Sequence, residues 1–257
     1  MEKLNGKVVI VTGAGRGIGR GVALRLAKED AHVVVASRSQ KTVDEVVQEI
    51  HDIGKSAIGV TVDVGIKDQV NAMVEQAVKA FGPVDILVNV AQSWGSPKKH
   101  TLSPPETPIE EIEEDEWDYT YQTGFKGTLY GMQAVFQGMK EQHWGRIINF
   151  GSPMALSGKP YMAPYNSTKG AITGLSLTAA HEWAKYGITV NCVLPTILTD
   201  ALKNNHEHEL KELVQRLPMG RLGDPEKDAG GLVAFLASDD AAYLTGMSII
   251  LDGGAAH

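Results

Sequence analysis

Short apolar runs alternate with longer helix-like segments along most of this chain. Runs of this kind predict strands at 7–11, 32–36, 57–62, 84–88, 146–150, 188–194 and 248–251. Helices are predicted between them, at 41–53, 69–81, 117–143 and 225–236. Such alternation is typical of right-handed crossovers between parallel strands. It predicts a Rossmann-type, doubly wound α/β fold, in which helices cover both faces of a mostly parallel, seven-stranded sheet.

Two segments interrupt the regular pattern. Four prolines lie within 92–116, where they disfavour regular structure. The second segment, at about 196–218, we predict to be a loop or lid over the substrate. No linker, internal repeat or low-complexity tract divides the sequence, so a single domain over 1–257 is the economical interpretation.

A glycine-rich segment follows the first predicted strand at once. It reads Thr-Gly-Ala-Gly-Arg-Gly-Ile-Gly over 12–19 and leads into a helix-like segment. Glycine lets a backbone approach a ligand closely, and a helix N-terminus attracts phosphate. A strand, a glycine loop and a helix in succession predict a dinucleotide site, with a tight packing turn as the alternative. The candidate cofactor contacts in this segment are Gly13, Arg16, Gly17, Ile18 and Gly19.

The end of the second predicted strand bears on the choice of cofactor. An acidic residue there would bind the ribose of NAD, whereas an arginine accommodates the 2′-phosphate of NADP. This chain has Ser37 and Arg38 at that place, and no acid. Both can bind phosphate, and Arg16 adds a second charge. We expect NADP(H) to be preferred and NAD(H) to remain possible; the alternative is that Arg38 is an ordinary solvated side chain.

Polar residues follow several other predicted strands. Asp63, Asn89, Ser152 and Thr199 each fall just past a strand end. Ligands of open parallel sheets bind beyond these carboxyl ends. The agreement of the four positions predicts that the ligand site lies along this edge of the sheet.

The candidate proton chemistry lies in the segment from Tyr165 to Lys169. In a helix, positions i and i+4 share one face, about 6 Å apart. A nearby ammonium favours the phenolate, so Lys169 should lower the pKa of Tyr165 from its ordinary value of about 10. The spacing predicts Tyr165 as a proton donor and acceptor near neutral pH. Taken alone, the same spacing also fits a surface helix with an exposed Tyr and Lys.

These motifs together resemble the short-chain dehydrogenase/reductase family over essentially the whole chain, and within it the single-domain carbonyl and 3-oxoacyl reductases. The matching positions are Thr12, Gly13, Gly17, Ile18, Gly19, Asp63, Asn89, Ala91, Ser152, Tyr165, Lys169, Asn191, Pro195, Thr199 and the segments 235–239 and 252–254. The resemblance implies that Tyr165 is the acid and base, that Ser152 orients the substrate oxygen, and that Lys169 binds the nicotinamide ribose.

The resemblance also implies the remaining cofactor contacts and an assembly. Asp63 and Val64 would meet the adenine, and Asn89 and Ala91 the adenosine side. The nicotinamide side would be met by Pro195, Ile197 and Thr199. Members of the family usually form homotetramers, here through the helices that begin near Trp117 and Tyr165.

Three places depart from the family pattern. The family's Asn-Asn-Ala-Gly after the fourth strand reads Asn-Val-Ala-Gln at 89–92, and its Pro-Gly after the sixth strand reads Pro-Thr at 195–196. The long helix would supply a catalytic Asn that holds a water on a proton path to Lys169, but Gly124 aligns with it here. The catalytic residues that carry over are Ser152, Tyr165 and Lys169. A backbone carbonyl and bound waters could complete the relay.

The substrate should sit among three loops beyond the strand ends. The candidate lining residues are Trp94, Met154, Leu156, Tyr161, Leu198 and Leu202. They suggest an apolar ketone with some bulk, although each side chain could equally serve loop packing.

Composition narrows the classes of function. The formal net charge of −7 and the pI near 5.6 argue against a nucleic-acid surface. The sequence has no signal-peptide profile and no apolar run of transmembrane length, so a cytoplasmic enzyme without membrane attachment is expected. The single cysteine, Cys192, excludes an intramolecular disulfide. We predict no metal site, because His206 and His208 are two apart and do not share a helical face.

The predicted function is NADPH-dependent reduction of a ketone, or in reverse oxidation of a secondary alcohol, with Tyr165 as acid and base. One alternative is an NAD-linked secondary alcohol dehydrogenase. Another is a non-catalytic dinucleotide-binding sensor on the same fold, which Gly124 motivates and the intact catalytic residues oppose. The expected partner is a small-molecule ketone or secondary alcohol.

Overall fold

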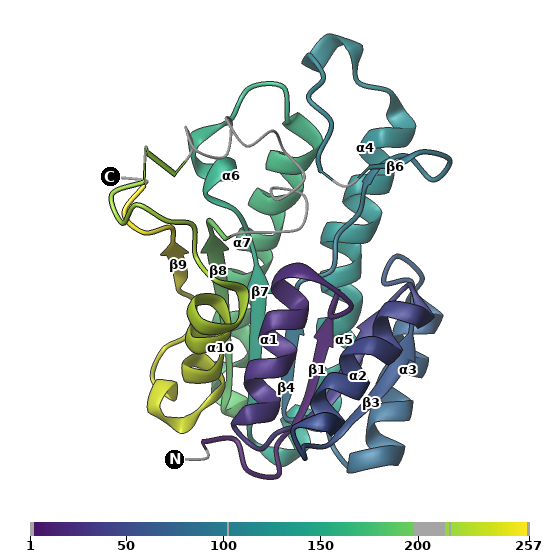
Figure 1. Cartoon of the computed structure of the whole chain (residues 1–257), viewed down its shortest axis with the longest axis vertical. Coiled ribbons are helices and arrows are strands. Elements are labelled where there is room, and N and C mark those ends of the chain that lie inside the picture. The colour runs from purple at the N-terminus through teal and green to yellow at the C-terminus, as the bar shows by residue number, and fades with distance from the viewer. Residues whose placement is uncertain (1–2, 102, 198–213, 216, 256–257) are drawn as a thin grey trace.

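The computed structural model describes residues 3–101, 103–197, 214–215 and 217–255. A seven-stranded sheet with the order β3-β2-β1-β4-β7-β8-β9 lies at its centre (Figure 1). Its strands are β1 (Val8–Thr12), β2 (His32–Ser37), β3 (Ala57–Thr61), β4 (Ile86–Asn89), β7 (Gly145–Phe150), β8 (Ile188–Pro195) and β9 (Ser248–Leu251). Every neighbouring pair in this sheet is parallel. The predicted seven-stranded α/β fold is confirmed.

The direction of winding reverses between β1 and β4. From β1 the chain first builds outwards through β2 to β3, and it then returns to build β4, β7, β8 and β9 on the other side. The connections at the carboxyl ends of β1 and β4 therefore leave in opposite directions. In open parallel sheets this place is a crevice suited to ligand binding.

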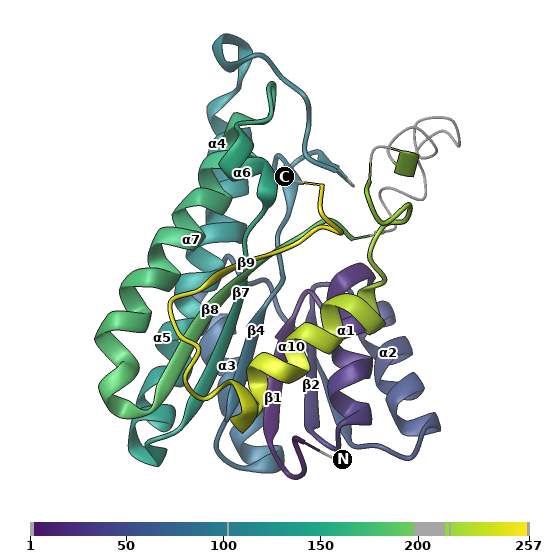
Figure 2. The same cartoon turned by 90° about the vertical axis from the view of Figure 1, so that its left-hand side faces the viewer.

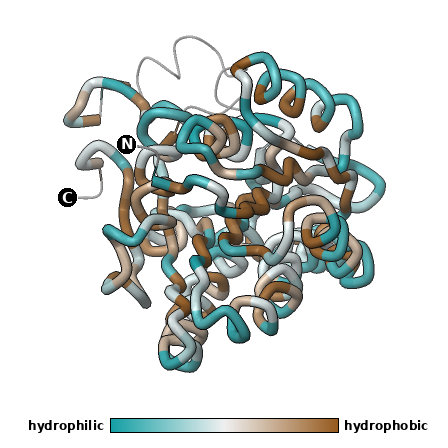
Figure 3. The backbone as a smooth tube through the Cα atoms, turned by 90° about the horizontal axis from the view of Figure 1, so that it is seen from below, coloured by the Kyte–Doolittle hydropathy of each residue, from teal (hydrophilic) through white to brown (hydrophobic). Residues whose placement is uncertain are grey.

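Helices cover both faces of the sheet (Figure 2). One face carries α1 (Gly17–Lys28), α2 (Gln40–Asp52) and α10 (Gly230–Ala237), and the other carries α3 (Lys67–Phe81), α5 (Gly127–Gln142) and α7 (Ala163–Trp183). Successive strand residues point to opposite faces, so Val9 and Val11 join one hydrophobic cluster while Val8 and Ile10 join the other. Burial on both faces explains the continuous apolar runs of the sequence. Figure 3 shows hydrophobic stretches of the backbone tube in the interior, with hydrophilic stretches mainly at the periphery.

The predicted helix at 117–143 is present, and it carries a π-helical segment in its middle. It begins earlier, as α4 (Glu114–Tyr121), passes through a π-helical segment at Gln122–Lys126, and continues as α5. Gly124 lies inside the π-helical segment, where a Cβ atom would come within 2.5 Å of the Cγ2 of Thr168 on α7. This close approach of two helices requires glycine. The predicted last helix, at 225–236, likewise starts as a π-helical turn at Pro225–Ala229 before α10.

The proline-containing segment is more ordered than its sequence indicates. It holds an antiparallel two-stranded hairpin, formed by β5 (Trp94–Gly95) and β6 (His100–Thr101), and a 3-10 turn at Ile109–Glu111. The predicted loop or lid at about 196–218 falls mostly outside the described residues. None of the described helices combines the length and apolar character needed to cross a membrane.

Asp85 ties the loop before β4 to the start of β1, and its substitution tests that link. Its Oδ2 accepts a hydrogen bond from Val8 N at 2.9 Å, and its Oδ1 accepts one from Lys7 Nζ at 3.0 Å. Asp85→Ala should lower the free energy of unfolding by about 1–3 kcal/mol, because the buried Val8 N–H loses its acceptor. Asp85→Asn keeps an acceptor oxygen and should cost less than half as much. Denaturant titration measures both, and equal losses would refute the role given to the backbone bond.

Candidate active site

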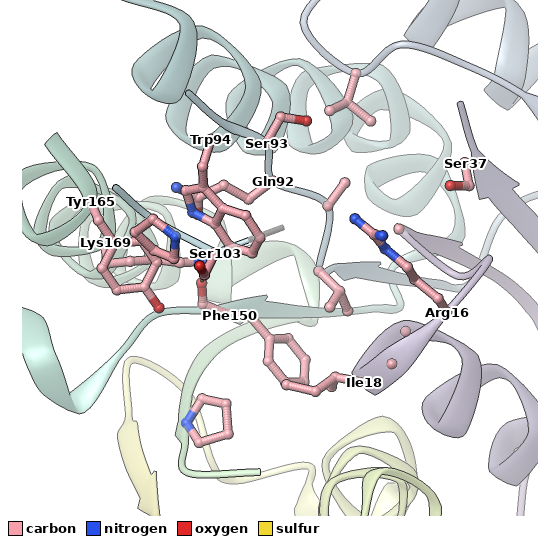
Figure 4. A pocket seen from close by; sticks show the side chains of 18 of the residues that line it. Arg16, Ile18, Ser37, Gln92, Ser93, Trp94, Ser103, Phe150, Tyr165 and Lys169 are labelled. Atoms are coloured by element: carbon pink, nitrogen blue, oxygen red, sulfur yellow. Dashed lines mark hydrogen bonds between the residues drawn. The ribbon is translucent and has the colours of Figure 1, made fainter. Parts of the chain in front are cut away.

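A cleft of about 570 Å³ opens at the carboxyl ends of the strands. Figure 4 shows Arg16 and Ser37 at one end of it and Trp94, Tyr165 and Lys169 at the other. The predicted site residues that line it are Gly13, Arg16, Gly17, Ile18, Gly19, Ser37, Arg38, Asp63, Val64, Ala91, Trp94, Met154, Tyr165, Lys169, Pro195 and Ile197. Those that do not line it are Asn89, Ser152, Leu156 and Tyr161. Leu198, Thr199 and Leu202 lie outside the described residues.

The glycine loop has the shape that a pyrophosphate needs. Gly13 and Gly17 adopt left-handed φ angles of +69° and +53°, which glycine tolerates best. A Cβ at Gly13 would lie 2.9 Å from the Ala91 Cα, and one at Gly19 would lie 2.3 Å from the Gly13 carbonyl oxygen. α1 begins at Gly17, with no acidic residue in its first turn among the described residues. Its first N–H groups and its dipole therefore face the cleft unneutralised and fit a phosphate group.

The end of the cleft beside the glycine loop carries two arginines. Arg16 and Arg38 are exposed at its rim, and Ser37 ends β2 beside them. Arg38 donates a hydrogen bond to the Tyr119 hydroxyl, which also lies 3.0 Å from Nδ1 of His100. The hairpin and α4 thus hold the guanidinium in place at the cleft. Two cations and a hydroxyl form a donor set suited to a phosphate monoester.

Asn89 and Thr12 shape the floor between β1 and β4. Thr12 Oγ1 accepts hydrogen bonds from the backbone N–H groups of Val90 and Ala91, both at 3.2 Å. Asn89 is buried, and its Nδ2 donates to Oδ1 of Asn149 at 2.9 Å. The amide of Asn89 is thus engaged beneath the cleft, and Ala91 is the residue of this turn that reaches the lining.

The catalytic candidates converge from two elements. Ser152 follows β7 and caps the short helix α6 (Pro153–Ser157), where its Oγ accepts a hydrogen bond from Met154 N at 3.2 Å. Tyr165 and Lys169 lie one turn apart on α7. Lys169 Nζ donates to the carbonyl oxygen of Phe150 at 2.7 Å and lies 5.9 Å from the centroid of the Tyr165 ring. A hydroxyl, a phenol and an ammonium are thereby gathered at one end of the cleft.

Burial has the largest effect on the pKa values of both Tyr165 and Lys169. Burial lowers the pKa of Lys169 to about 8, against a smaller opposing effect of Cys192. Burial raises the pKa of Tyr165, and its interaction with the Ser152 side chain acts in the opposite direction. The prediction that the pKa of Tyr165 lies below its ordinary value because of Lys169 is therefore wrong. The reason is that desolvation disfavours the phenolate and that Lys169 directs its ammonium to the Phe150 carbonyl.

The predicted substrate residues divide into two groups. Trp94 and Met154 line the cleft, and the Trp94 ring lies 6.4 Å from the Tyr165 ring. Leu156 and Tyr161 are 62% and 58% exposed and lie outside the lining. Tyr161 has a left-handed φ of +64°, and its carbonyl accepts a hydrogen bond from Thr107 N at 2.8 Å. In the described structure this tyrosine organises a loop.

Several residues that line the cleft are not among the predicted site residues. They are Val62, Val90, Gln92, Ser93, Ser103, Pro104, Phe150, Gly151 and Met162. The hairpin before Ser103 has a sequence signal, because Ser96 and Pro97, which follow β5, are typical of a turn between two short strands. The others come from strand ends and loops whose direction depends on tertiary contacts. The described part of the chain holds no group of three or more His, Cys, Asp or Glu side chains that could bind a metal ion.

Known proteins resemble this chain in sequence, and one solved structure resembles it in fold, over nearly its whole length. A sequence profile described as short chain dehydrogenase matches residues 7–210. A 3-oxoacyl-(acyl-carrier-protein) reductase FabG of Staphylococcus epidermidis is 38% identical, covering 96% of this chain and 98% of the relative. Human dehydrogenase/reductase SDR family member 4 is 35% identical, covering 98% and 88% respectively. A solved structure described as a putative gluconate dehydrogenase from Agrobacterium tumefaciens superposes with a TM-score of 0.90 at 28% identity, covering 99% and 98%.

The buried Lys169 should make stability depend on pH. Its native pKa of about 8 lies below the ordinary value for lysine. Between pH 8 and 10 the unfolded chain therefore binds more protons at this residue than the folded chain does. The free energy of unfolding of the wild type consequently rises with pH through this window. Lys169→Met removes that gain. The stability of wild type relative to this variant should rise by on the order of 1–3 kcal/mol across the window. Denaturant titrations at pH 7, 8, 9 and 10 measure it, with the exposed Lys185→Met as control. A pH-independent difference would contradict a buried, titrating Lys169.

Proposed function

This chain belongs to the short-chain dehydrogenase family of oxidoreductases, and on that premise we propose that it reduces a ketone with NADPH. The observation that carries the proposal is the gathering of Tyr165, Lys169 and Ser152 beside a cleft that begins at a glycine loop. The oxidation of a secondary alcohol is the same reaction in reverse.

The cleft fits a nicotinamide dinucleotide along its length. The glycine loop and the first turn of α1 would hold the pyrophosphate, and Asp63 and Val64 would border the adenine. Pro195 and Ile197 would border the nicotinamide, and Thr199, outside the described residues, remains a further candidate for this role. Arg16 and Arg38 at the rim favour NADP(H) over NAD(H), because they can pair with the negative charges of the 2′-phosphate, which NAD(H) lacks.

The chain's own residues would manage the proton and the substrate oxygen. The hydride for the carbonyl carbon would come from a reduced dinucleotide held along the cleft by the glycine loop. Tyr165 donates its phenolic proton to the developing alkoxide, and the Ser152 hydroxyl donates a hydrogen bond to the same oxygen. Lys169 returns a proton to Tyr165. The balance is one hydride and one proton added to the ketone, which becomes a secondary alcohol.

The ionisation of the site favours the reductive direction. Burial raises the pKa of Tyr165, so the phenol is protonated at neutral pH and is ready to act as an acid. A general base for alcohol oxidation would need the phenolate, which this environment disfavours.

The substrate side of the cleft suits an apolar ketone. Trp94 and Met154 provide apolar surface near the phenol, and Leu198 and Leu202 remain candidates from the segment beyond Ile197. The 38% identity to a 3-oxoacyl-(acyl-carrier-protein) reductase makes 3-oxoacyl thioesters the first class to assay, followed by aryl and alkyl ketones.

An NAD-linked secondary alcohol dehydrogenase is the second candidate. Its support is the engagement of Arg38 by Tyr119, which leaves fewer donors for a 2′-phosphate. The likeness to a structure described as a putative gluconate dehydrogenase supports the dehydrogenase part of this candidate.

The proposal includes a cytoplasmic homotetramer. Trp117 on α4 is 38% exposed, and Leu177 on α7 is 47% exposed. Both offer apolar surface on the helices through which we propose that the subunits meet. The buried thiol of Cys192 is compatible with a reducing compartment.

Removal of the phenol hydroxyl tests the proposed chemistry. Tyr165→Phe should reduce kcat with any accepted ketone by at least about 100-fold, because general acid catalysis contributes a factor of this size. NADPH binding, followed by fluorescence, should change less than about 3-fold. The matched control is Tyr243→Phe, since Tyr243 is fully exposed. NADPH binding without turnover of any ketone in wild type would instead support a dinucleotide-binding sensor.

Arg38 decides the cofactor preference in this proposal. Arg38→Ala should raise the Kd for NADPH by about 10- to 100-fold, the equivalent of one lost charge-assisted contact, and should leave the Kd for NADH within about 2-fold. The control is Lys28→Ala at the distant end of α1. Equal weakening of both cofactors would remove the phosphate role of Arg38 and favour the NAD-linked alternative.

A further inference from the structure

The side-chain amide of Gln92 has no hydrogen-bond partner among the described residues, and it lies beside α7, the helix that carries Tyr165 and Lys169. Both polar atoms of the Gln92 side chain, Nε2 and Oε1, are buried and have no hydrogen-bond partner among the described residues. Gln92 nevertheless lines the cleft, and Figure 4 shows it next to Trp94 at the Tyr165 and Lys169 end. An unmade hydrogen bond at a buried amide is costly. A donor and an acceptor held together in this way are suited to a small ligand such as water.

The position of this amide is set by the π-helical segment. A Cβ atom at Gly124 would lie 3.1 Å from Cδ and 3.2 Å from Nε2 of Gln92, and 2.5 Å from Cγ2 of Thr168. The amide therefore fills the space from which any side chain at position 124 would grow. Thr168 immediately precedes Lys169 on α7, so the amide lies against the turn that carries the lysine. π-Helical insertions of this kind often mark functional sites.

Two departures from the family pattern meet at this point. Position 92, where the family has Gly, holds an amide, and position 124, where the family has an amide, holds Gly. The two positions are distant in sequence yet in contact in the structure.

We propose that Gln92 holds a water that supplies protons to Lys169, the task for which the helix itself has no side chain. This inference rests on the proposed reductase function. Gln92 acts through the water and is a positioning residue. After each reduction Tyr165 takes a proton from Lys169, and Lys169 takes one from the water chain, so that bulk solvent supplies the net proton.

The surroundings of Lys169 leave room for this role. An ammonium has three N–H donors, and one is used by the Phe150 carbonyl. Among the described residues, the titratable side chains that face this group are Tyr165 on α7 and Cys192 on β8, and Glu116 of α4 borders the adjoining depression with Trp94. A pKa of about 8 for Lys169 allows it to exchange protons near neutral pH.

Gln92→Leu removes the amide while keeping comparable bulk. We expect kcat to fall by about 10-fold, with the loss increasing as pH rises and with a larger solvent deuterium isotope effect, because proton supply becomes limiting. The Kd for NADPH and the melting temperature should stay close to those of wild type. The matched control is Gln137→Leu, which lies on the exposed side of α5. A pH profile and an isotope effect equal to those of the control would overturn the proposal.

A rescue experiment asks whether the amide can return to the helix. The double variant Gln92→Gly with Thr168→Ser clears the space around position 124, and adding Gly124→Asn to it restores one amide. The triple variant should regain at least about 5-fold in kcat over the double variant, because contacting residues are coupled. Equal rates and equal pH profiles for the folded double and triple variants would contradict a role for the amide.

The failure of this inference is separable from the failure of the proposed function. If wild type reduces ketones, Tyr165→Phe abolishes the reaction and Gln92→Leu behaves as its control, only the role of Gln92 is refuted. If wild type reduces no ketone, a crystal structure of the wild-type protein still decides. It should hold an ordered water within about 3.2 Å of the Gln92 amide and linked to Lys169 Nζ. An amide turned to bulk solvent, or packed dry, would overturn the inference.

Discussion

The hydrogen bond from Lys169 Nζ to the Phe150 carbonyl joins the two elements that meet at the active site. It spans 2.7 Å and links α7 to the end of β7. A buried ammonium needs such a partner, so this contact fixes the cation beneath the cleft. Helix geometry then places Tyr165 one turn earlier on the same face, and Ser152 follows Phe150 by two residues. One buried contact sets the relative positions of all three candidate catalytic groups.

The same burial has electrostatic consequences that run against the simplest view of a tyrosine and lysine pair. Desolvation lowers the pKa of Lys169 and raises that of Tyr165, so each group is held closer to its neutral form. The resting site therefore presents a neutral phenol as an acid, with a lysine that exchanges protons near neutral pH. A site of this kind is prepared to deliver a proton to a developing alkoxide, and it needs a route by which the lysine is resupplied.

The fold could be predicted from the sequence because it depends on local patterns. Strands buried on both faces appear as continuous apolar runs, and polar residues that follow them mark the binding edge of the sheet. The glycine loop was equally accessible, since Gly13 and Gly17 need left-handed backbone. These features follow from short-range periodicity and from single residues with special conformational freedom.

Other features depend on contacts between distant segments and could not be predicted. The π-helical segment around Gly124 reflects its close approach to Thr168 on another helix. The direction of the Gln92 amide follows from that packing. The predicted lowering of the Tyr165 pKa is wrong because the sequence shows the neighbouring Lys169 but does not show how deeply the phenol is buried. Leu156 and Tyr161 could not be told from pocket residues, because exposure is a property of the folded loop.

The ionisation of Lys169 is the quantity on which this account depends most directly. Its Nζ can be titrated by NMR in protein labelled at lysine, with Lys169→Met identifying the resonance. Burial of the Lys169 ammonium against the Phe150 carbonyl predicts a midpoint of about 8, well below those of the exposed lysines. A midpoint above about 10, the ordinary value for a solvated lysine, would show that the ammonium is not buried against Phe150 and would contradict the account.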